Sequence, residues 1–422
     1  MKRIFILTTA FIFILNSQAQ IVSTLAGSGT KGYADGTGAT AQFATPTGLA
    51  VDATGNVYVS DYNNNKIRKI SPTGNVTSFA GSGIFGYKDG LGAEAQFMYL
   101  EGIVTDAKGN VYVADLGNYR IRKITPNAEV STFAGSGVIG IADGQGINAQ
   151  FSGPAGLTID AAGNLYVTDG QRIRKVTPDG VVSTIAGSGI AGYLDGPANS
   201  AKFFNPCGIA IDVSGNLFVM DSDNSKIRKI SASGEVSTLA GSDRGFADGV
   251  GLDSKFNTAS SLTIDTQGNL FVADSYNHRI RKITSTGAVS TFSGSVSGFS
   301  DGDISTALFK YPDVIASDIN GNLYVSASQK IRKITLSPSG IDKNIIISSI
   351  KIYPNPVDKE LSIEIPCTDN LNKIIITDLT GKMVFNQIGK SNSINVEKLS
   401  KGVYILEVVS GINEMRTKFM KD

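Results

Sequence analysis

The chain has 422 residues, of which 41% are hydrophobic and 18% are charged, so it can bury a sizeable core. Its 48 glycines and its lack of tryptophan are typical of a turn-rich, all-β protein and do not suit a helical or disordered one. The 38 basic residues nearly balance the 37 acidic residues, so net charge gives no reason to expect a polyanionic partner such as nucleic acid.

The N-terminus has the pattern of an export signal. Lys2 and Arg3 precede the apolar run IFILTTAFIFIL, and the small residue Ala19 follows at a suitable cleavage point. We therefore predict a signal peptide over 1–19 and no transmembrane segment in the mature chain, because the run is short for a membrane span. The two cysteines, Cys207 and Cys367, fall in different predicted domains, so we expect no disulfide framework.

A repeat fills the next three hundred or so residues and determines the predicted fold. Ile-Arg-Lys recurs at 67–69, 121–123, 173–175, 227–229, 280–282 and 331–333. Each repeat has four short runs rich in β-branched and aromatic residues, bounded by Gly, Asn, Asp or Pro. In the first repeat these predicted strands are GLAVD at 48–52, VYVSD at 57–61, KIRKI at 66–70 and VTSFAG at 76–81. Four antiparallel strands per period of roughly 50 residues predict one propeller blade per repeat.

The two ends of the repeat region predict a closed ring. A copy of the fourth strand, IVSTLAGS, stands alone at 21–28, and the last repeat stops after its third strand at 330–335. The N-terminal strand can therefore complete the last blade, which removes an exposed sheet edge. We predict a six-bladed β-propeller over 20–336, closed by its N-terminal strand, and we expect a monomer.

The unit PTGLAVDATGNVYVSDYNNNKIRKI resembles an NHL repeat, and the following AGSG and DG segments are similar to long NHL repeats of bacterial surface proteins and teneurins. The resemblance implies the propeller fold but not one function, since NHL propellers include RNA binders, protein binders, ligand sensors and a few lyases.

After a predicted linker at 337–346, the period disappears, and alternating strands with Gly turns predict a small Ig-like β-sandwich over 347–422. Its motifs YPNP at 353–356, LTGKMV at 379–384 and LSKGVY at 399–404 resemble the C-terminal sorting domain of type IX secretion substrates. The resemblance implies export by that secretion machinery through residues 347–422, with a secreted or outer-membrane surface location. An adhesive module is the alternative for this domain.

Charged residues sit at fixed positions in the repeats. Lys66, Arg68 and Lys69 have equivalents in every blade, and acids recur at the positions of Asp35, Asp52 and Asp61, although blade six has Ala327 at the last of these. A polyanion-binding ring, as in RNA-binding NHL propellers, is the functional alternative. We instead predict inter-blade ion pairs, because acids balance these bases and the arginine fork suits carboxylates.

The loop GYADGTGATAQF at 32–43 raises the question of an ion site. Its repeats keep Gly, Asp-Gly, Ala and Phe but no further acid, whereas a calcium loop needs several oxygen ligands. We predict that the loop is architectural, with Phe43 as a wedge. The residue after its first Gly is mostly aromatic and forms a candidate stacking ring for a glycan or peptide if it is exposed, or a loop anchor if it is buried. The set comprises Tyr33, Tyr87, Ile141, Tyr193, Phe246 and Phe299.

The positions that vary between blades are the best places for one specific site. The residue that enters the first strand should lie at the mouth of the central channel, and it reads Thr47, Glu101, Ala155, Cys207, Ser260 and Asp313. Two carboxylates and a thiol in this ring fit a cationic or polar ligand, with a solvated rim as the alternative.

These features predict a non-enzymatic, secreted or cell-surface module that binds an extracellular glycan, peptide or protein on the loop-rich face of the propeller. The only histidine, His278, is expected in a surface loop, so a multi-histidine metal centre cannot form. We assign no catalytic residue, no metal ligand and no cofactor. A metal-assisted hydrolase or lyase at the channel mouth, with one divalent cation on carboxylates, stays the alternative.

Overall fold

The computed structural model describes residues 20–335, 351–364, 371–378, 382–389, 393–410 and 413–422. Contacts divide the chain into two compact units, one up to Ser337 and one from Pro338 onwards. The predicted signal peptide at 1–19, the predicted linker at 337–346 and Cys367 lie outside the described residues.

The first unit consists of six antiparallel sheets, each with four long strands. The first three blades are β2 (Pro46–Val51), β3 (Val57–Asp61), β4 (Lys66–Ile70) and β5 (Val76–Ala80); β7 (Leu100–Thr105), β8 (Val111–Asp115), β9 (Arg120–Ile124) and β10 (Glu129–Ala134); and β12 (Pro154–Ile159), β13 (Leu165–Asp169), β14 (Arg172–Val176) and β15 (Val181–Ala186). Blades four and five are β17 (Pro206–Ile211), β18 (Leu217–Asp221), β19 (Lys226–Ile230) and β20 (Glu235–Ala240); and β22 (Ala259–Ile264), β23 (Leu270–Asp274), β24 (Arg279–Ile283) and β25 (Ala288–Ser293).

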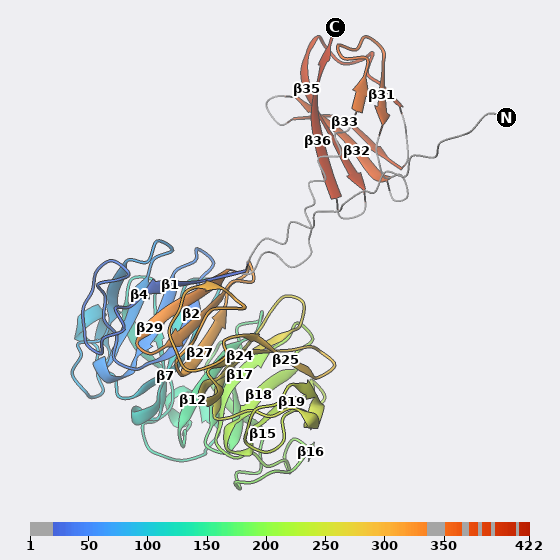
Figure 1. Cartoon of the computed structure of the whole chain (residues 1–422). Coiled ribbons are helices and arrows are strands. Elements are labelled where there is room, and N and C mark those ends of the chain that lie inside the picture. The colour runs from blue at the N-terminus through green and yellow to red at the C-terminus, as the bar shows by residue number, and fades with distance from the viewer. Residues whose placement is uncertain (1–19, 336–350, 365–370, 379–381, 390–392, 411–412) are drawn as a thin grey trace, which may run out of the picture. The chain divides into compact units, whose positions relative to one another are not determined.

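Blade six joins the two ends of the propeller, as predicted. Its strands β27 (Pro312–Ser317), β28 (Leu323–Ala327) and β29 (Lys330–Thr335) come from the last repeat, and β1 (Ile21–Ala26) pairs with β29 as the fourth strand. Figure 1 shows β1 in blue beside the orange β29. The six-bladed ring closed by its N-terminal strand is therefore confirmed.

Short elements occupy the connections between the long strands. A two-residue strand from the long loop pairs with the outermost strand in five blades: β6 (Gly90–Leu91), β11 (Gly144–Gln145), β16 (Gly196–Pro197), β21 (Gly249–Val250) and β26 (Gly302–Asp303). Single 3-10 turns follow the second strand of four blades: η1 (Tyr62–Asn64), η3 (Leu116–Asn118), η5 (Ser222–Asn224) and η7 (Ser275–Asn277). Three more lie in long loops: η2 (Gly92–Glu94), η4 (Gly146–Asn148) and η6 (Gly251–Asp253).

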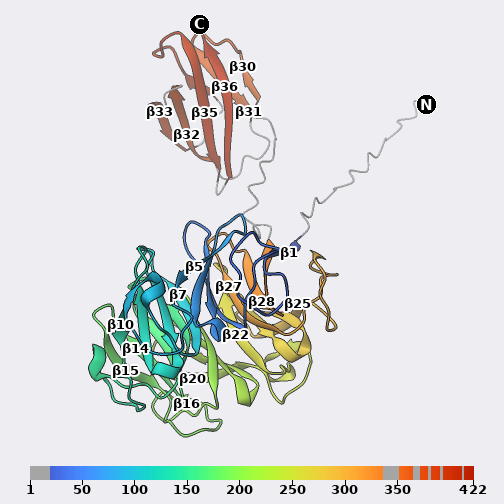
Figure 2. The same ribbon diagram turned by 90° about the vertical axis from the view of Figure 1, so that its left-hand side faces the viewer.

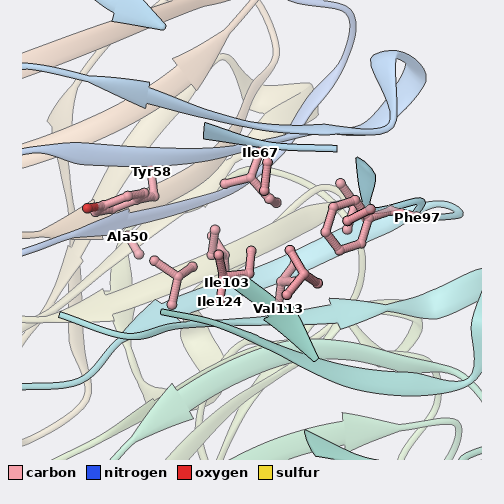
Figure 3. Close-up of a cluster of buried hydrophobic side chains, with 12 residues drawn as sticks. Ala50, Tyr58, Ile67, Phe97, Ile103, Val113 and Ile124 are labelled. Carbon is pink, nitrogen blue, oxygen red and sulfur yellow. The ribbon is translucent and has the colours of Figure 1, made fainter. Parts of the chain in front are cut away.

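The core of the propeller lies between neighbouring blades. Figure 3 shows one such cluster, in which Tyr58 and Ile67 of blade one pack with Ile103, Val113 and other buried residues of blade two. Phe97, from the loop that leads into blade two, belongs to the same cluster and is fully buried. Its equivalent in the first repeat, Phe43, is also fully buried, which agrees with the predicted wedge.

Each third strand carries a fully buried arginine that joins a loop to a blade. In blade one, Arg68 Nη1 lies 2.9 Å from Asp61 Oδ2, and its Nη2 lies 2.5 Å from Asp35 Oδ1. The same guanidinium donates to the carbonyl oxygens of Ala34 and Gln42, so it fastens the loop at both ends.

The predicted ion pairs are present, but the prediction that they join neighbouring blades is wrong. The loop folds back on the blade that follows it in sequence, so Asp35, Asp61 and Arg68 belong to one repeat. In blade six, where Ala327 replaces the second-strand aspartate, Arg332 keeps a single carboxylate partner, Asp301.

The second unit contains two small sheets, seen in Figure 2. One sheet has the order β30 (Lys351–Tyr353), β31 (Glu360–Glu364) and β34 (Ser393–Asn395), and the other has the order β33 (Met383–Ile388), β32 (Leu371–Asp378), β35 (Gly402–Ser410) and β36 (Asn413–Lys421). Buried side chains of both sheets, among them Leu361, Ile376 and Leu406, form one cluster. The unit is thus a small β-sandwich. No helix in the described part of the chain is long and apolar enough to cross a membrane.

Candidate functional site

The six ring positions lie together at one end of the central channel. Each is the second residue of its innermost strand, and all six line one cavity of about 150 Å³: Thr47, Glu101, Ala155, Cys207, Ser260 and Asp313. The long loops lie at the same end. The turn η1, which follows the second strand there, contacts the first long loop, because its Asn64 side chain donates a hydrogen bond to the carbonyl oxygen of Gly32. The structure therefore brings together the ring that the repeat pattern identified.

Close approach of the innermost strands makes the channel narrow. The residue after the ring position is Gly in blades one to four, and a Cβ on Gly156 would lie 1.9 Å from the carbonyl oxygen of Cys207. Only glycine fits such an approach between backbones. This constraint was not predicted from the sequence, although the recurring Gly after the ring position is a signal of it.

Three polar members of the ring are engaged by neighbouring blades. Thr47 Oγ1 donates to the Leu100 carbonyl at 2.6 Å, Ser260 Oγ donates to the Asp313 carbonyl at 2.6 Å, and the Cys207 thiol donates to the Ser260 carbonyl at 2.9 Å. These bonds join successive innermost strands, so the three side chains have a structural role.

The two acids of the ring, Glu101 and Asp313, have raised pKa values. Loss of hydration and the nearby Asp313 carboxylate raise the pKa of Glu101 to about 8. Burial also raises the pKa of Asp313, although the Ser260 hydroxyl works in the opposite direction. Burial, together with the two acids, raises the pKa of the Cys207 thiol to about 12, so this free cysteine is protonated at neutral pH and is a poor nucleophile.

A wider pocket of about 380 Å³ continues from Asp313 and Ser260 towards solvent. Its wall includes Tyr276 and Tyr311, whose rings are 59% and 45% exposed and meet edge to face at 5.4 Å. His278 supports this wall, since its Nδ1 accepts a hydrogen bond from the Tyr311 amide at 3.3 Å.

His278 has a positive φ of 57° and ends η7, in the place that Asn65, Tyr119 and Ser225 take in other blades. The prediction of a loop position for this histidine is confirmed. Nothing in the described part of the chain places it with a Ser, Cys or Asp in a catalytic arrangement.

A second aromatic group joins η1 of blade one to the loop that leads into blade two. The rings of Tyr62 and Tyr99 stack with centroids 5.1 Å apart, and Phe85 meets Tyr99 edge to face. Burial and then the Glu101 carboxylate raise the pKa of Tyr62. Of the two channel acids, Asp313 shares a cavity with tyrosines, Tyr276 and Tyr311.

The predicted circle of mostly aromatic loop residues, which begins with Tyr33, does not lie at the channel mouth. Its tyrosines contact the outer strands of the blades instead. The Tyr33 hydroxyl is 2.9 Å from Ser78 Oγ of β5, and its ring lies 4.9 Å from the Arg68 guanidinium. Tyr87 and Tyr193 make the same hydroxyl contact with the fourth strands of their own blades. These three rings are 44–49% exposed, so they are neither fully buried anchors nor part of the channel mouth. The structure therefore separates the two predicted sets of site residues.

Metal coordination has little support. Among the residues that the structure describes, no group of three or more His, Cys, Asp or Glu side chains is placed to hold a metal ion. Glu101 and Asp313 by themselves supply two carboxylates, fewer ligands than a calcium or zinc site needs.

Comparison with known families agrees with both predicted resemblances. The NHL repeat model matches residues 43–70 and 256–283, and the Teneurin NHL domain model matches residues 140–197. The model of the secretion system C-terminal sorting domain matches residues 351–422. The chain contains NHL repeats and a secretion sorting domain. A domain of this kind indicates secretion and attachment at the cell surface.

A plant protein matches most of this chain. Protein SUPPRESSOR OF QUENCHING 1, chloroplastic, of Arabidopsis thaliana is 29% identical over 355 residues, which are 77% of this chain and 33% of that protein. This chain therefore spans about a third of that relative.

Solved structures with a similar fold carry different names. An auxiliary nutrient binding protein from Bacteroides ovatus has a TM-score of 0.57 and 16% identity, over 75% of this chain and 76% of that chain. A putative phosphatase from Bacteroides thetaiotaomicron has a TM-score of 0.56 and 16% identity, over 75% and 78%. At this identity the likeness shows the fold alone, and the fold accommodates proteins named as enzymes and as binding proteins.

Proposed function

We propose that this secreted or surface-attached protein is a non-enzymatic binding module whose ligand, a glycan, peptide or protein, docks on the loop-rich face of the propeller. The observation that carries the proposal is the pair of connected cavities at that face, which share Ser260 and Asp313. The inner cavity is lined in part by the six ring positions, which carry a different residue in every blade, and the outer one has an aromatic wall.

The chemistry of these cavities favours binding over turnover. Burial raises the pKa of the Cys207 thiol, His278 Nδ1 accepts a hydrogen bond from the Tyr311 amide, and Thr47 and Ser260 donate to backbone carbonyls of neighbouring blades. Exposed tyrosines beside a polar cavity are typical of sites that recognise a ligand by stacking and hydrogen bonds. The alternative of a metal-assisted hydrolase or lyase has no specific observation in its favour.

The test uses the purified mature chain on glycan and peptide arrays, followed by titration of each positive ligand in solution. We expect saturable binding that Tyr311→Ala weakens by at least about tenfold, or ~1.4 kcal/mol. The control variant Tyr353→Ala lies in the second unit, on an exposed tyrosine, and should bind as the wild type does. Conversion of a bound ligand to product by the wild type, abolished by Glu101→Ala or Asp313→Ala, would overturn the proposal.

A further inference from the structure

The buried arginines of the third strands are paired with aspartates, whereas the two acids at the channel mouth have no basic partner among the described residues. Every buried arginine of a third strand lies within 2.9 Å of at least one aspartate, as in Arg122 with Asp89 and Asp115. Glu101 and Asp313 have no such partner, and no Lys or Arg lines either cavity. Both acids are half-buried, and a carboxylate that loses hydration without gaining a counter-charge carries a free-energy cost.

The surrounding polar groups offset this cost only in part, since the pKa of Asp313 is raised despite the Ser260 hydroxyl. Three of the four other ring members donate to backbone carbonyls, and Ala155 has no polar side-chain atom. Burial and Asp313 are the influences on the Glu101 carboxyl, and within the described residues it accepts no hydrogen bond. The ring thus presents two acids that the protein itself does not neutralise.

Aromatic rings complete the setting. Tyr311 and Tyr276 line the outer pocket together with Asp313. The faces of tyrosine rings attract cations, and the attraction grows where water is displaced. Carboxylates and tyrosines in one recess therefore select for positive charge.

We propose that the channel mouth binds a cationic organic group, a protonated amine or a guanidinium, between the carboxylates of Glu101 and Asp313, with Tyr276 and Tyr311 on the side of Asp313. The inference rests on the proposed binding function and names the chemistry of its ligand. The inner cavity of about 150 Å³ takes the charged head, and the outer pocket of about 380 Å³ takes the part of the ligand that follows it. An arginine or lysine side chain of a peptide, or a free small amine, carries this head group.

The test is isothermal titration of the mature chain with blocked arginine, N-acetyl-arginine methylamide, and with its neutral isostere, N-acetyl-citrulline methylamide. We expect the arginine probe to bind and the citrulline probe to bind at least about tenfold more weakly. Putrescine and blocked lysine form two further arms, and these distinguish a free amine from a side chain as the source of the charge. This comparison needs no variant, so it does not depend on whether a substitution folds.

Variants then locate the site. Glu101→Gln and Asp313→Asn should each weaken the arginine probe by at least about tenfold, and the double variant should abolish detectable binding. The matched control is Glu129→Gln, because this exposed acid begins the outer strand β10, away from the channel.

A pH series adds an independent readout. The guanidinium stays charged, so affinity should rise between about pH 6 and pH 9 as Glu101 loses its proton. The titratable groups that interact with it are Asp313, Tyr62 and the Cys207 thiol, and Tyr276 and Tyr311 line the adjoining pocket.

Several outcomes would overturn the inference. Equal binding of the arginine and citrulline probes, no binding of any cationic probe at millimolar concentration, or binding that the two charge variants leave unchanged would each do so. Tight binding of Ca²⁺ alone, without the organic cations, would also contradict it. A ligand from the arrays that binds independently of both acids would leave the proposed binding function intact and refute only the cationic site.

Discussion

Replacing Glu101 by glutamine should make the propeller more stable at alkaline pH and leave it unchanged at acidic pH. Folding raises the pKa of this carboxyl from 4.5 to about 8, because the channel removes its hydration and Asp313 lies nearby. A group whose pKa is raised in the folded state supports folding below its unfolded pKa, and this support is lost as the pH rises through the folded value. The wild type should therefore lose stability relative to the glutamine variant as the pH rises from 4.5 to about 8.

The magnitude follows from the same two values. At about 1.36 kcal/mol per pH unit, a rise from 4.5 to about 8 penalises the folded state by about 5 kcal/mol once the carboxyl is ionised in both states. Water that enters the channel screens part of this penalty, so we expect a measured difference of about 2–4 kcal/mol. Glutamine keeps the size of the side chain and cannot ionise.

The assay is urea unfolding of the wild type, Glu101→Gln and the control Glu129→Gln, followed by circular dichroism at about pH 5 and about pH 9. The difference in unfolding free energy between two of these proteins at one pH cancels the contributions of all other titrating groups. From about pH 5 to about pH 9, the free energy of unfolding of Glu101→Gln should rise by about 2–4 kcal/mol relative to that of the wild type. The free energy of unfolding of the control should not change relative to the wild type. An equal difference at both pH values would refute the reasoning, because it would mean that Glu101 ionises in the folded protein as it does in water.

Three further predictions concern the scaffold and export. Arg122→Met should lower the free energy of unfolding by about 3–5 kcal/mol in urea titrations, because it leaves a buried aspartate without its cation, and an unchanged value would refute the role of the ion-pair network. Gly156→Ala should cost about 1–3 kcal/mol and lower the melting temperature, because its Cβ would meet the Cys207 carbonyl, whereas Gly153→Ala has open space and serves as the control. Deletion of 347–422 should leave the propeller in the periplasm when cell fractions are probed, and normal surface display of the truncated chain would contradict the sorting role.

Most of the fold followed from the repeat. The four strand runs, their spacing and the lone fourth strand at the N-terminus predicted the blades and the closure by β1, because period-2 alternation and turn residues are local signals. The ring at the channel mouth also followed, since the start of an innermost strand has one place in a propeller. These are features in which position along a strand determines position in space.

Features that depend on approach across the fold did not follow from the sequence. The partner of Asp35 was assigned to a neighbouring blade, whereas the loop returns to Arg68 of its own repeat, and periodicity cannot distinguish one blade from the next. The place of Tyr33 on the outer strands and the need for glycine at Gly156 depend on distances between separate segments. Such distances are set by packing, which a pattern within one strand does not record.

The closure of blade six has a consequence for how the protein is made. Its fourth strand, at Ile21–Ala26, is synthesised first, and its partner β29, at Lys330–Thr335, is synthesised last among the propeller strands. Five blades can form from contiguous sequence while the chain is still growing, but the sixth needs contacts between the two ends. Contacts of such separation form late and slowly. Until then β29 has an unpaired edge, so the interval between completing the fifth blade and docking β1 is when this protein is most exposed to aggregation or to pairing with another copy.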